Sequence, residues 1–231
     1  MLNKLKFVSV FPTIQGEGVN CGKSTTFIRL HTTECFPNNR VCSFCDTINK
    51  KNYNENLNIL DIEDYLNKTN PNMITITGGE PLACEFNDLK DLISLCNDYC
   101  DYLEIETNGA YWSSFTDYEK HYLFQNIDCL NVSPKLKISN VRYDYNIEDF
   151  FHYGRDFNYK FVVSEKNFEE EIVQIADWQK KLNLLDEVWL MPMTPSSIEF
   201  EKKVFDFCVK MKYNYSTRLH ITLFGNIEKE I

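Results

Sequence analysis

Short apolar runs rich in β-branched and aromatic residues recur along this chain, and polar or turn-forming residues bound each of them. Runs of this length and composition are typical of strands in a sheet. We expect strands at 7–11, Thr26–Leu30, Met73–Thr77, Tyr102–Thr107, Asp128–Val132, Tyr159–Val163, Glu187–Met191 and Arg218–Leu223.

Longer segments between these runs carry the periodicity of amphipathic helices. From Asp88 to Cys100, apolar residues recur at intervals of three and four, which puts them on one helix face. The residues on that face are Leu89, Leu92, Ile93, Leu95 and Cys96. Other helical patterns cover Asp61–Asn67, Phe168–Lys181 and Ser197–Lys212, with Asp61 and Ser197 placed to cap the helices that they begin.

The alternation of strands and helices predicts an α/β fold with a mainly parallel sheet. No internal repeat, low-complexity tract or linker divides the sequence, so we expect a single domain over residues 1–231. Residues 137–156 are polar and aromatic and are expected to form a surface excursion. Functional groups of parallel sheets gather at the carboxyl ends of the strands.

Composition and charge argue against several classes of function. The formal net charge is -10, which argues against nucleic-acid binding through clustered Lys and Arg. The chain has no run of eighteen apolar residues, so no membrane span is expected. The N-terminal segment lacks the features of a signal peptide. The nine cysteines are therefore expected to be reduced thiols of a cytoplasmic protein.

Cys35, Cys42 and Cys45 lie within eleven residues and form the strongest local signal. Thiolates select zinc or iron–sulfur clusters, and three of them leave one position of a four-ligand site open for chemistry. The spacing leaves a second interpretation open, a structural zinc site completed by His31 or Cys21.

Polar turns follow several of the predicted strands. They are Gln15–Gly18, Thr77–Pro81, Glu106–Gly109, Ser133–Lys135 and Met191–Thr194. Paired glycines let a ligand approach the backbone closely, although each turn taken alone also fits an ordinary solvated loop. Arg29 and His220 lie in apolar runs, where a polar side chain either pairs with a protein group or binds a ligand.

Taken in order, these motifs resemble the 7-carboxy-7-deazaguanine synthase family of radical S-adenosylmethionine (SAM) enzymes. The resemblance covers nearly the whole chain, and its most specific parts are Thr-Ile-Gln-Gly-Glu-Gly and Cys-Asp-Thr. The matching segments are 11–18, Phe27–Leu30, Val41–Thr47, Thr77–Pro81, Ile105–Gly109, Val132–Lys135, Leu190–Met193 and Arg218–His220.

The resemblance implies an incomplete (β/α) barrel, a homodimer and a [4Fe–4S] cluster whose open iron holds SAM. Reductive cleavage of SAM then gives a 5′-deoxyadenosyl radical that takes a hydrogen from C6 of 6-carboxy-5,6,7,8-tetrahydropterin. Ring contraction with loss of ammonia yields 7-carboxy-7-deazaguanine, which supplies queuosine-type 7-deazapurines. The cofactor carries the radical step and the protein positions the reactants. The resemblance also implies Mg²⁺ and an electron donor such as flavodoxin or ferredoxin.

Individual roles follow from the same resemblance. Cys35, Cys42 and Cys45 would bind the cluster, and Thr47 would bind Mg²⁺. SAM would lie against Gly79, Ser133, Pro134, Lys135, Met191, Pro192, Met193 and Thr194. The pterin would contact Ile14, Gln15, Gly16, Glu17, Arg29 and Thr77, with Glu106 and His220 as further candidates in the same pocket.

The chain departs from the common radical SAM pattern at its first cysteine, because six residues separate Cys35 from Cys42 where three are usual. Two other functions are alternatives. A glycyl-radical activase would lack the Gln15 and Glu17 pair and the threonine after the third cysteine. A zinc-binding module without activity would leave the Gly-Gly-Glu-Pro and Ser-Pro-Lys turns without a role.

Overall fold

One curved sheet runs through the molecule. The structure is a computed structural model that describes residues 4–32, 35–38, 42, 45, 54, 57–136, 157–182 and 188–225. The strands are β1 (Phe7–Ile14), β2 (Ser24–Leu30), β3 (Met73–Gly78), β4 (Tyr102–Thr107), β5 (Cys129–Val132), β6 (Phe157–Val163), β7 (Val188–Pro192) and β8 (Asn214–Tyr215). Their order in the sheet is their order in the sequence, and only the pairing of β1 with β2 is antiparallel.

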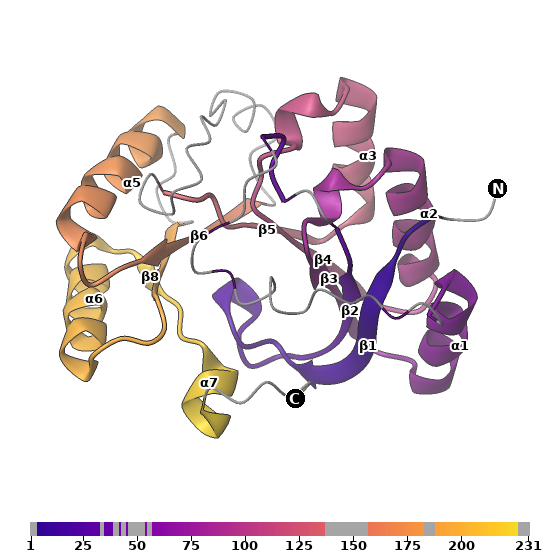
Figure 1. The fold of residues 1–231 in the computed structure, drawn as a ribbon, viewed down its shortest axis with the longest axis horizontal. Helices are drawn as coiled ribbons and strands as arrows, with labels where there is room; N and C mark the ends of the chain where they lie inside the picture. Colours follow the sequence, from indigo (N-terminus) through magenta and orange to yellow (C-terminus); the bar gives the residue numbers. More distant parts are fainter. Residues whose placement is uncertain are drawn as a thin grey trace.

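All the α-helices except the last connect strands and lie along the outside of the curve (Figure 1). The α-helices are α1 (Ile59–Thr69), α2 (Phe86–Asn97), α3 (Asp117–Asn126), α5 (Phe168–Leu182), α6 (Ile198–Met211) and α7 (Leu219–Phe224). Single 3-10 turns occur at Gly18–Asn20, Pro81–Ala83 and Trp112–Ser114. This mainly parallel α/β architecture confirms the predicted fold class.

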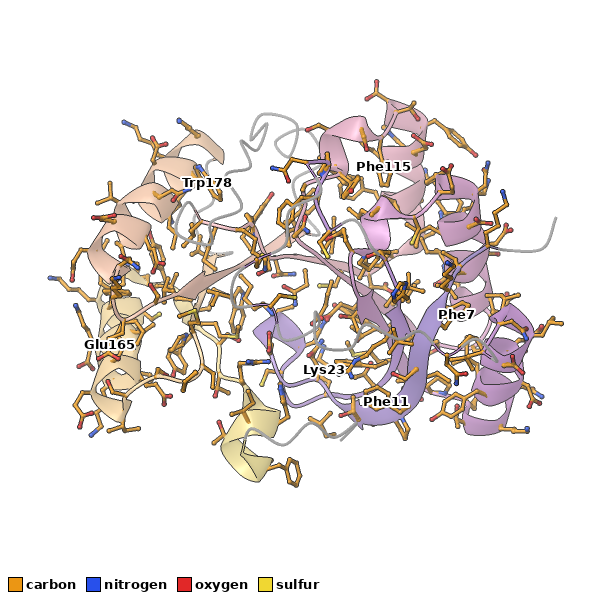
Figure 2. All side chains as sticks on the ribbon, in the orientation of Figure 1. Phe7, Phe11, Lys23, Phe115, Glu165 and Trp178 are labelled. Atoms are coloured by element: carbon orange, nitrogen blue, oxygen red, sulfur yellow. The ribbon has the colours of Figure 1, made fainter. Side chains whose placement is uncertain are left out.

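The two faces of the sheet differ in polarity because side chains alternate along each strand. On the face toward the helices, strand residues such as Ile28, Ile76, Ile105 and Leu190 are fully buried in one apolar core. Phe7 and Trp178, labelled in Figure 2, belong to this core near opposite ends of the sheet. The intervening strand residues face the inner side of the curve, where the functional groups lie.

The structure corrects the prediction for the C-terminal segment. Arg218–Leu223 was expected to be a strand, but Leu219–Phe224 forms helix α7. The sheet already ends with β8, and the backbone groups after Arg218 are satisfied locally. Thr222 N donates to Arg218 O at 3.0 Å and Gly225 N to Ile221 O at 2.8 Å. Alternating polar and apolar residues fit a strand pattern here, but among the residues that the structure describes no strand pairs with them.

Helix boundaries were predicted with mixed success. Ser197 caps α6 as expected and accepts a hydrogen bond from Phe200 N at 3.1 Å. The cap of α1 is Asn58 instead of Asp61, which closes the capping box from the third helical position. Helix α3 and strand β8 were not predicted. In the described part of the chain, no helix is both long and apolar enough to cross a membrane.

Candidate active site

A row of polar side chains crosses the inner face of the sheet from β2 to β6. Strand register aligns Arg29 with Thr77, Glu106 with Asn131, and Asn131 with Asn158. A hydrogen bond of 2.7 Å from Thr77 Oγ1 to Glu106 Oε2 joins the two parts of the row. Three predicted substrate residues, which come from three different strands, therefore lie side by side.

Gln15 uses its side chain to hold two carboxyl groups of β4. It is buried, and its Nε2 donates to Glu104 Oε1 at 2.6 Å and to Glu106 Oε1 at 3.2 Å. Its Oε1 accepts from Glu17 N at 3.3 Å. The Nδ2 of Asn20 also donates to Glu104. The side chain of Gln15, which was predicted to contact the pterin, thus bonds to protein groups and positions Glu106.

Burial and the neighbouring charge of Glu106 raise the pKa of Glu104 to about 7, despite the hydrogen bonds from Asn20 and Gln15. An ordinary glutamate in the unfolded chain has a pKa of about 4.3. Because the folded-state pKa is raised, the stabilisation belongs to the protonated form. It is complete below about pH 4.3 and is lost as the pH rises toward 7.

We therefore expect Glu104→Gln to remove part of the pH dependence of stability. Between about pH 4.5 and 7.5, the wild type should lose roughly 2 kcal/mol more unfolding free energy than the variant. Urea unfolding at a series of pH values measures this difference. Glu63→Gln, on the exposed side of α1, is the control and should keep the wild-type pH profile. Parallel profiles for Glu104→Gln and the wild type would contradict the assignment.

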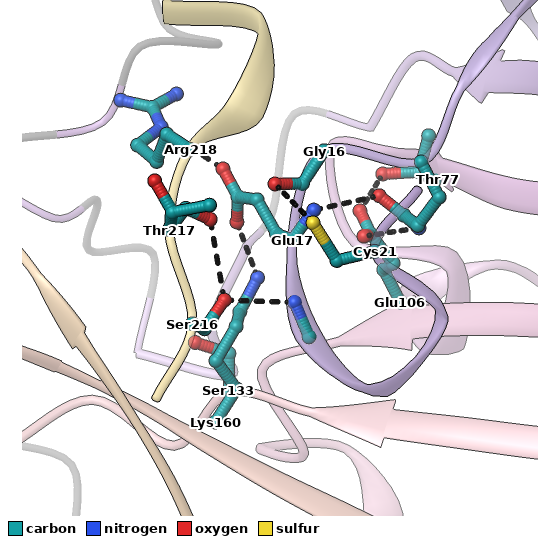
Figure 3. Close-up of polar contacts among 12 residues, drawn as sticks. Gly16, Glu17, Cys21, Thr77, Glu106, Ser133, Lys160, Ser216, Thr217 and Arg218 are labelled. Atoms are coloured by element: carbon teal, nitrogen blue, oxygen red, sulfur yellow. Dashed lines mark hydrogen bonds and ion pairs between the residues drawn. The ribbon is translucent and has the colours of Figure 1, made fainter. Parts of the chain in front are cut away.

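Glu17 forms a largely buried ion-pair group with two cations from distant parts of the chain (Figure 3). Its Oε2 contacts Lys160 Nζ of β6, and its Oε1 accepts from Arg218 Nε at 2.9 Å. Burial alone would raise the pKa of Glu17, but the charges of Lys160 and Arg218 lower it to about 2. This carboxylate is therefore ionised at neutral pH and fixes the loop that follows β1.

The segment that leads into α7 lies against the same loop. Ser216 Oγ accepts from Gly18 N at 2.8 Å, and Leu219 N donates to Gly16 O at 3.0 Å. A side chain at Gly16 would come within 2.5 Å of His220 Nδ1. His220, a predicted substrate residue, is thereby placed beside the Gln-Gly-Glu-Gly loop.

The Gly-Gly-Glu-Pro turn after β3 packs against the end of β2. Gly78 has a φ of 115°, and a Cβ there would lie 2.2 Å from Leu30 O. A Cβ at Gly79 would lie 2.1 Å from Thr32 Oγ1, which accepts from Glu80 N at 2.6 Å. Both glycines are therefore required by backbone packing as well as by any ligand.

Glu80 ties this turn to the end of β4. It is buried, and its carboxyl group accepts from Leu82 N at 3.1 Å and from Asn108 N at 2.7 Å. Asn108 in turn donates through Nδ2 to Cys35 O at 2.6 Å. The Gly-Gly-Glu-Pro turn, the Glu-Thr-Asn-Gly turn and the first cysteine thus form one connected unit.

The three cysteines lie together at this edge of the sheet. Cys42 is buried with Phe36 and Ala110, and Cys35 and Cys45 pack against that small cluster. Burial, together with the charges of Cys45, Glu80 and Cys42, raises the pKa of Cys35 to about 11. Three thiolates so placed repel one another, and a cationic metal centre among them would remove that penalty.

The three thiols suit an iron–sulfur cluster. Each thiolate of a four-iron cluster binds its own iron, so the sulfurs need not converge on one point. Cys21, suggested as a fourth zinc ligand, instead donates to Gly16 O at 3.4 Å in the loop after β1.

The predicted SAM residues lie along the same edge. Lys135 Nζ donates to Ser133 Oγ at 3.0 Å, and the Lys135 charge acts to lower the pKa of Cys35 and Cys42. Residues 191–194 lie at the end of β7, where Met193 N donates to Val163 O at 2.8 Å. Thr47, the predicted Mg²⁺ ligand, lies outside the described residues.

Several residues of this site were not singled out from the sequence. Glu104, Lys160 and Arg218 interact with Gln15 or Glu17 from strands and loops far along the chain. Two features of the sequence could have identified Glu104 and Lys160. Glu104 precedes Glu106 by two positions, so both side chains lie on the same face of the strand. Lys160 is a charged residue inside an apolar run, as Arg29 is.

Comparison with known protein families shows the general class of this protein. Residues 14–147 match the family described as a 4Fe-4S single cluster domain. Because this match spans more than half of the chain, the protein belongs to that class of iron–sulfur proteins.

Comparison with individual proteins identifies the family within this class. The chain is 30% identical over 193 residues to a 7-carboxy-7-deazaguanine synthase of Clostridium acetobutylicum, covering 82% of this chain and 78% of that protein. It is 27% identical over 229 residues to one of Hyperthermus butylicus, covering 94% and 92%. Its fold matches the crystal structure of QueE from Escherichia coli with a TM-score of 0.65 at 21% identity, over 94% of this chain and 95% of that chain. The chain belongs to the 7-carboxy-7-deazaguanine synthase family.

Proposed function

We propose that this protein is a radical SAM 7-carboxy-7-deazaguanine synthase that converts 6-carboxy-5,6,7,8-tetrahydropterin, with loss of ammonia, to 7-carboxy-7-deazaguanine. The observation that supports this most directly is the placement of the three thiols beside the inner polar row. Asn108 links Cys35 to the turn after β4, and Glu106 of that strand bonds to Thr77. A cofactor at the thiols would therefore face a substrate on the inner side of the sheet.

Cys35, Cys42 and Cys45 would hold three irons of the cluster. The cluster and SAM supply the 5′-deoxyadenosyl radical that removes a hydrogen from the substrate. The remaining work falls to the protein. Gly79, the Ser133, Pro134 and Lys135 turn and residues Met191, Pro192, Met193 and Thr194 would border SAM along the same sheet edge.

The pterin would be held by Arg29, Thr77, Glu106 and the backbone of Ile14 to Glu17. The Arg29 guanidinium lies 4.8 Å from the centre of the Phe11 ring, which limits its movement. It is suited to bind a carboxylate of the substrate. The side chains of Gln15 and Glu17 already bond to protein groups, so recognition by this loop would come mainly from its peptide groups. His220 would lie at its border.

Three further features of the proposal rest on the family resemblance. Mg²⁺ prefers oxygen ligands and would be bound by Thr47 and the substrate carboxylate. A flavodoxin or ferredoxin would supply the electron, and two copies of the chain would form a homodimer.

The function is tested by anaerobic reconstitution with iron and sulfide, followed by incubation with SAM, a reductant, Mg²⁺ and 6-carboxytetrahydropterin. Mass spectrometry should show 7-carboxy-7-deazaguanine, and its yield should fall when Mg²⁺ is omitted. Tetrahydropterin without the carboxyl group is the control and should give no deazaguanine product. Formation of 5′-deoxyadenosine without the deazaguanine would refute the substrate assignment and leave SAM cleavage in place.

A further inference from the structure

Asn131 of β5 is a buried amide that makes no hydrogen bond in the structure. Asn131 is only 2% exposed, and neither Nδ2 nor Oδ1 of its side chain has a hydrogen-bond partner among the described residues. Other buried asparagines on this side of the sheet are bonded: Asn20 donates to Glu104, and Asn108 donates to Cys35 O. Burying an amide without partners is unfavourable, so its presence calls for a partner that binds there.

The strand register places this amide in the inner polar row. Asn131 is aligned with Glu106 on β4 and with Asn158 on β6. Ser133, the first residue after β5, lies two positions further along the chain, at the carboxyl end of the strand. Asn131 thus lies one layer deeper than the proposed SAM residues and beside Glu106, which belongs to the proposed substrate set.

The loop after β1 approaches the amide from the other side. A Cβ at Gly18 would come within 2.7 Å of Asn131 Nδ2. Gly18 has a φ of 69°, and its N–H is bonded to Ser216 Oγ at 2.8 Å. Gly18 therefore packs directly against the amide, and a residue with a side chain could not take its place unless Asn131 moved.

We propose that Asn131 binds the pterin ring of the substrate, an inference that rests on the function proposed above. An amide offers one donor group and one acceptor atom, which complement the adjacent N–H and C=O groups of a pterin's lactam edge. The choice of pterin over SAM follows from position, because the neighbours of Asn131 are Glu106 and Gly18. Asn131 would thus supply a side-chain hydrogen bond to the pterin ring. The polar side chains of the neighbouring loop, Gln15 and Glu17, already bond to protein groups.

The test is a binding measurement that does not depend on turnover. Cluster-reconstituted enzyme with SAM, but without reductant, is titrated anaerobically with 6-carboxytetrahydropterin by calorimetry. Asn131→Leu keeps a similar shape but cannot hydrogen-bond, and its pterin affinity should fall about tenfold or more. Its SAM affinity should stay within about twofold of the wild type, and the melting temperature of the ligand-free protein should not fall, because an unpaired buried amide is removed.

Controls separate this inference from the function on which it rests. Asn158→Leu, one strand away, alters an amide that already donates to Cys129 Sγ at 3.4 Å and should leave pterin affinity unchanged. If Asn131→Leu packs poorly and melts at a lower temperature, Asn131→Ala provides the same measurement without added volume.

The outcomes are distinct. Unchanged pterin affinity in the Asn131 variants, or an equal loss in Asn158→Leu, would overturn the role of Asn131 while the proposed function stood. A loss of SAM affinity in place of pterin affinity would overturn the choice of ligand. Wild-type enzyme that fails to bind the pterin at all would overturn the proposed function and this inference together.

Discussion

Replacing Cys35 with alanine is expected to reduce deazaguanine formation to background and to prevent assembly of a four-iron cluster. Cys35 supplies one of only three thiols at the site, and a cluster held by two thiolates lacks its normal set of protein ligands. Iron and sulfide analysis after anaerobic reconstitution, together with the visible absorption of the cluster, measures the effect. Cys35 is the most informative ligand to replace because of the six-residue gap before Cys42.

Cys208→Ala is the matched control for this variant. Cys208 is a buried thiol of α6, and its Sγ lies 3.5 Å from Asn214 O on the helix-covered side of the sheet. It should retain the full iron and sulfide content and lose only about 1 kcal/mol of stability. If Cys35→Ala bound iron and sulfide as well as Cys208→Ala does, Cys35 would not be a cluster ligand.

Replacing Glu17 with glutamine is expected to destabilise the fold by about 3 kcal/mol, because it leaves Lys160 without its closest counter-charge in a buried position. The Lys160 side chain is 8% exposed, so water does little to replace the carboxylate. The measurement is urea unfolding near pH 7. The pKa of Glu17 is lowered to about 2, so the stabilisation it provides is complete above about pH 4.3 and is lost as the pH falls toward 2.

Two further variants serve as controls for Glu17→Gln. Glu169→Gln breaks an exposed pair, in which Lys203 Nζ lies 2.8 Å from Glu169 Oε1, and should cost less than about 1 kcal/mol. Glu17→Gln combined with Lys160→Met removes the Glu17–Lys160 pair, leaves the partly exposed Arg218 as the remaining cation and should recover much of the lost stability. A Glu17→Gln variant as mildly affected as Glu169→Gln would show that the buried ion pair contributes little.

Local sequence patterns were enough to predict the α/β class, most strands and helices, and the cysteine group. Each of these depends on periodicity or on spacing within about a dozen residues. The motifs also identified the family, which the comparisons confirm. Helix α3 escaped prediction because its apolar residues do not gather on one face, and α7 because its alternating pattern resembles a strand.

The partners of the site residues could not be predicted in the same way. Gln15 bonds to Glu104 and Glu106 across 89 and 91 residues of sequence, and these pairings exist only once the sheet has formed. The sequence therefore marked Gln15 and Glu17 as important without showing that their side chains bind protein groups. Asn131 could not be identified from the sequence, because one asparagine in a short strand forms no recognisable motif. Only the structure shows that its side chain is buried without a hydrogen-bond partner.

The contacts of the loop after β1 have a consequence for the order of folding. Glu17 is separated from Arg218 by 201 residues, and Gly18 from Ser216 by 198. During synthesis this loop leaves the ribosome early, yet its partners are among the later residues to be made. Contacts so distant in sequence form late and slow the search for the native state. The substrate side of the protein would thus be assembled last, after the cysteine-bearing edge of the sheet has been available to receive its cluster.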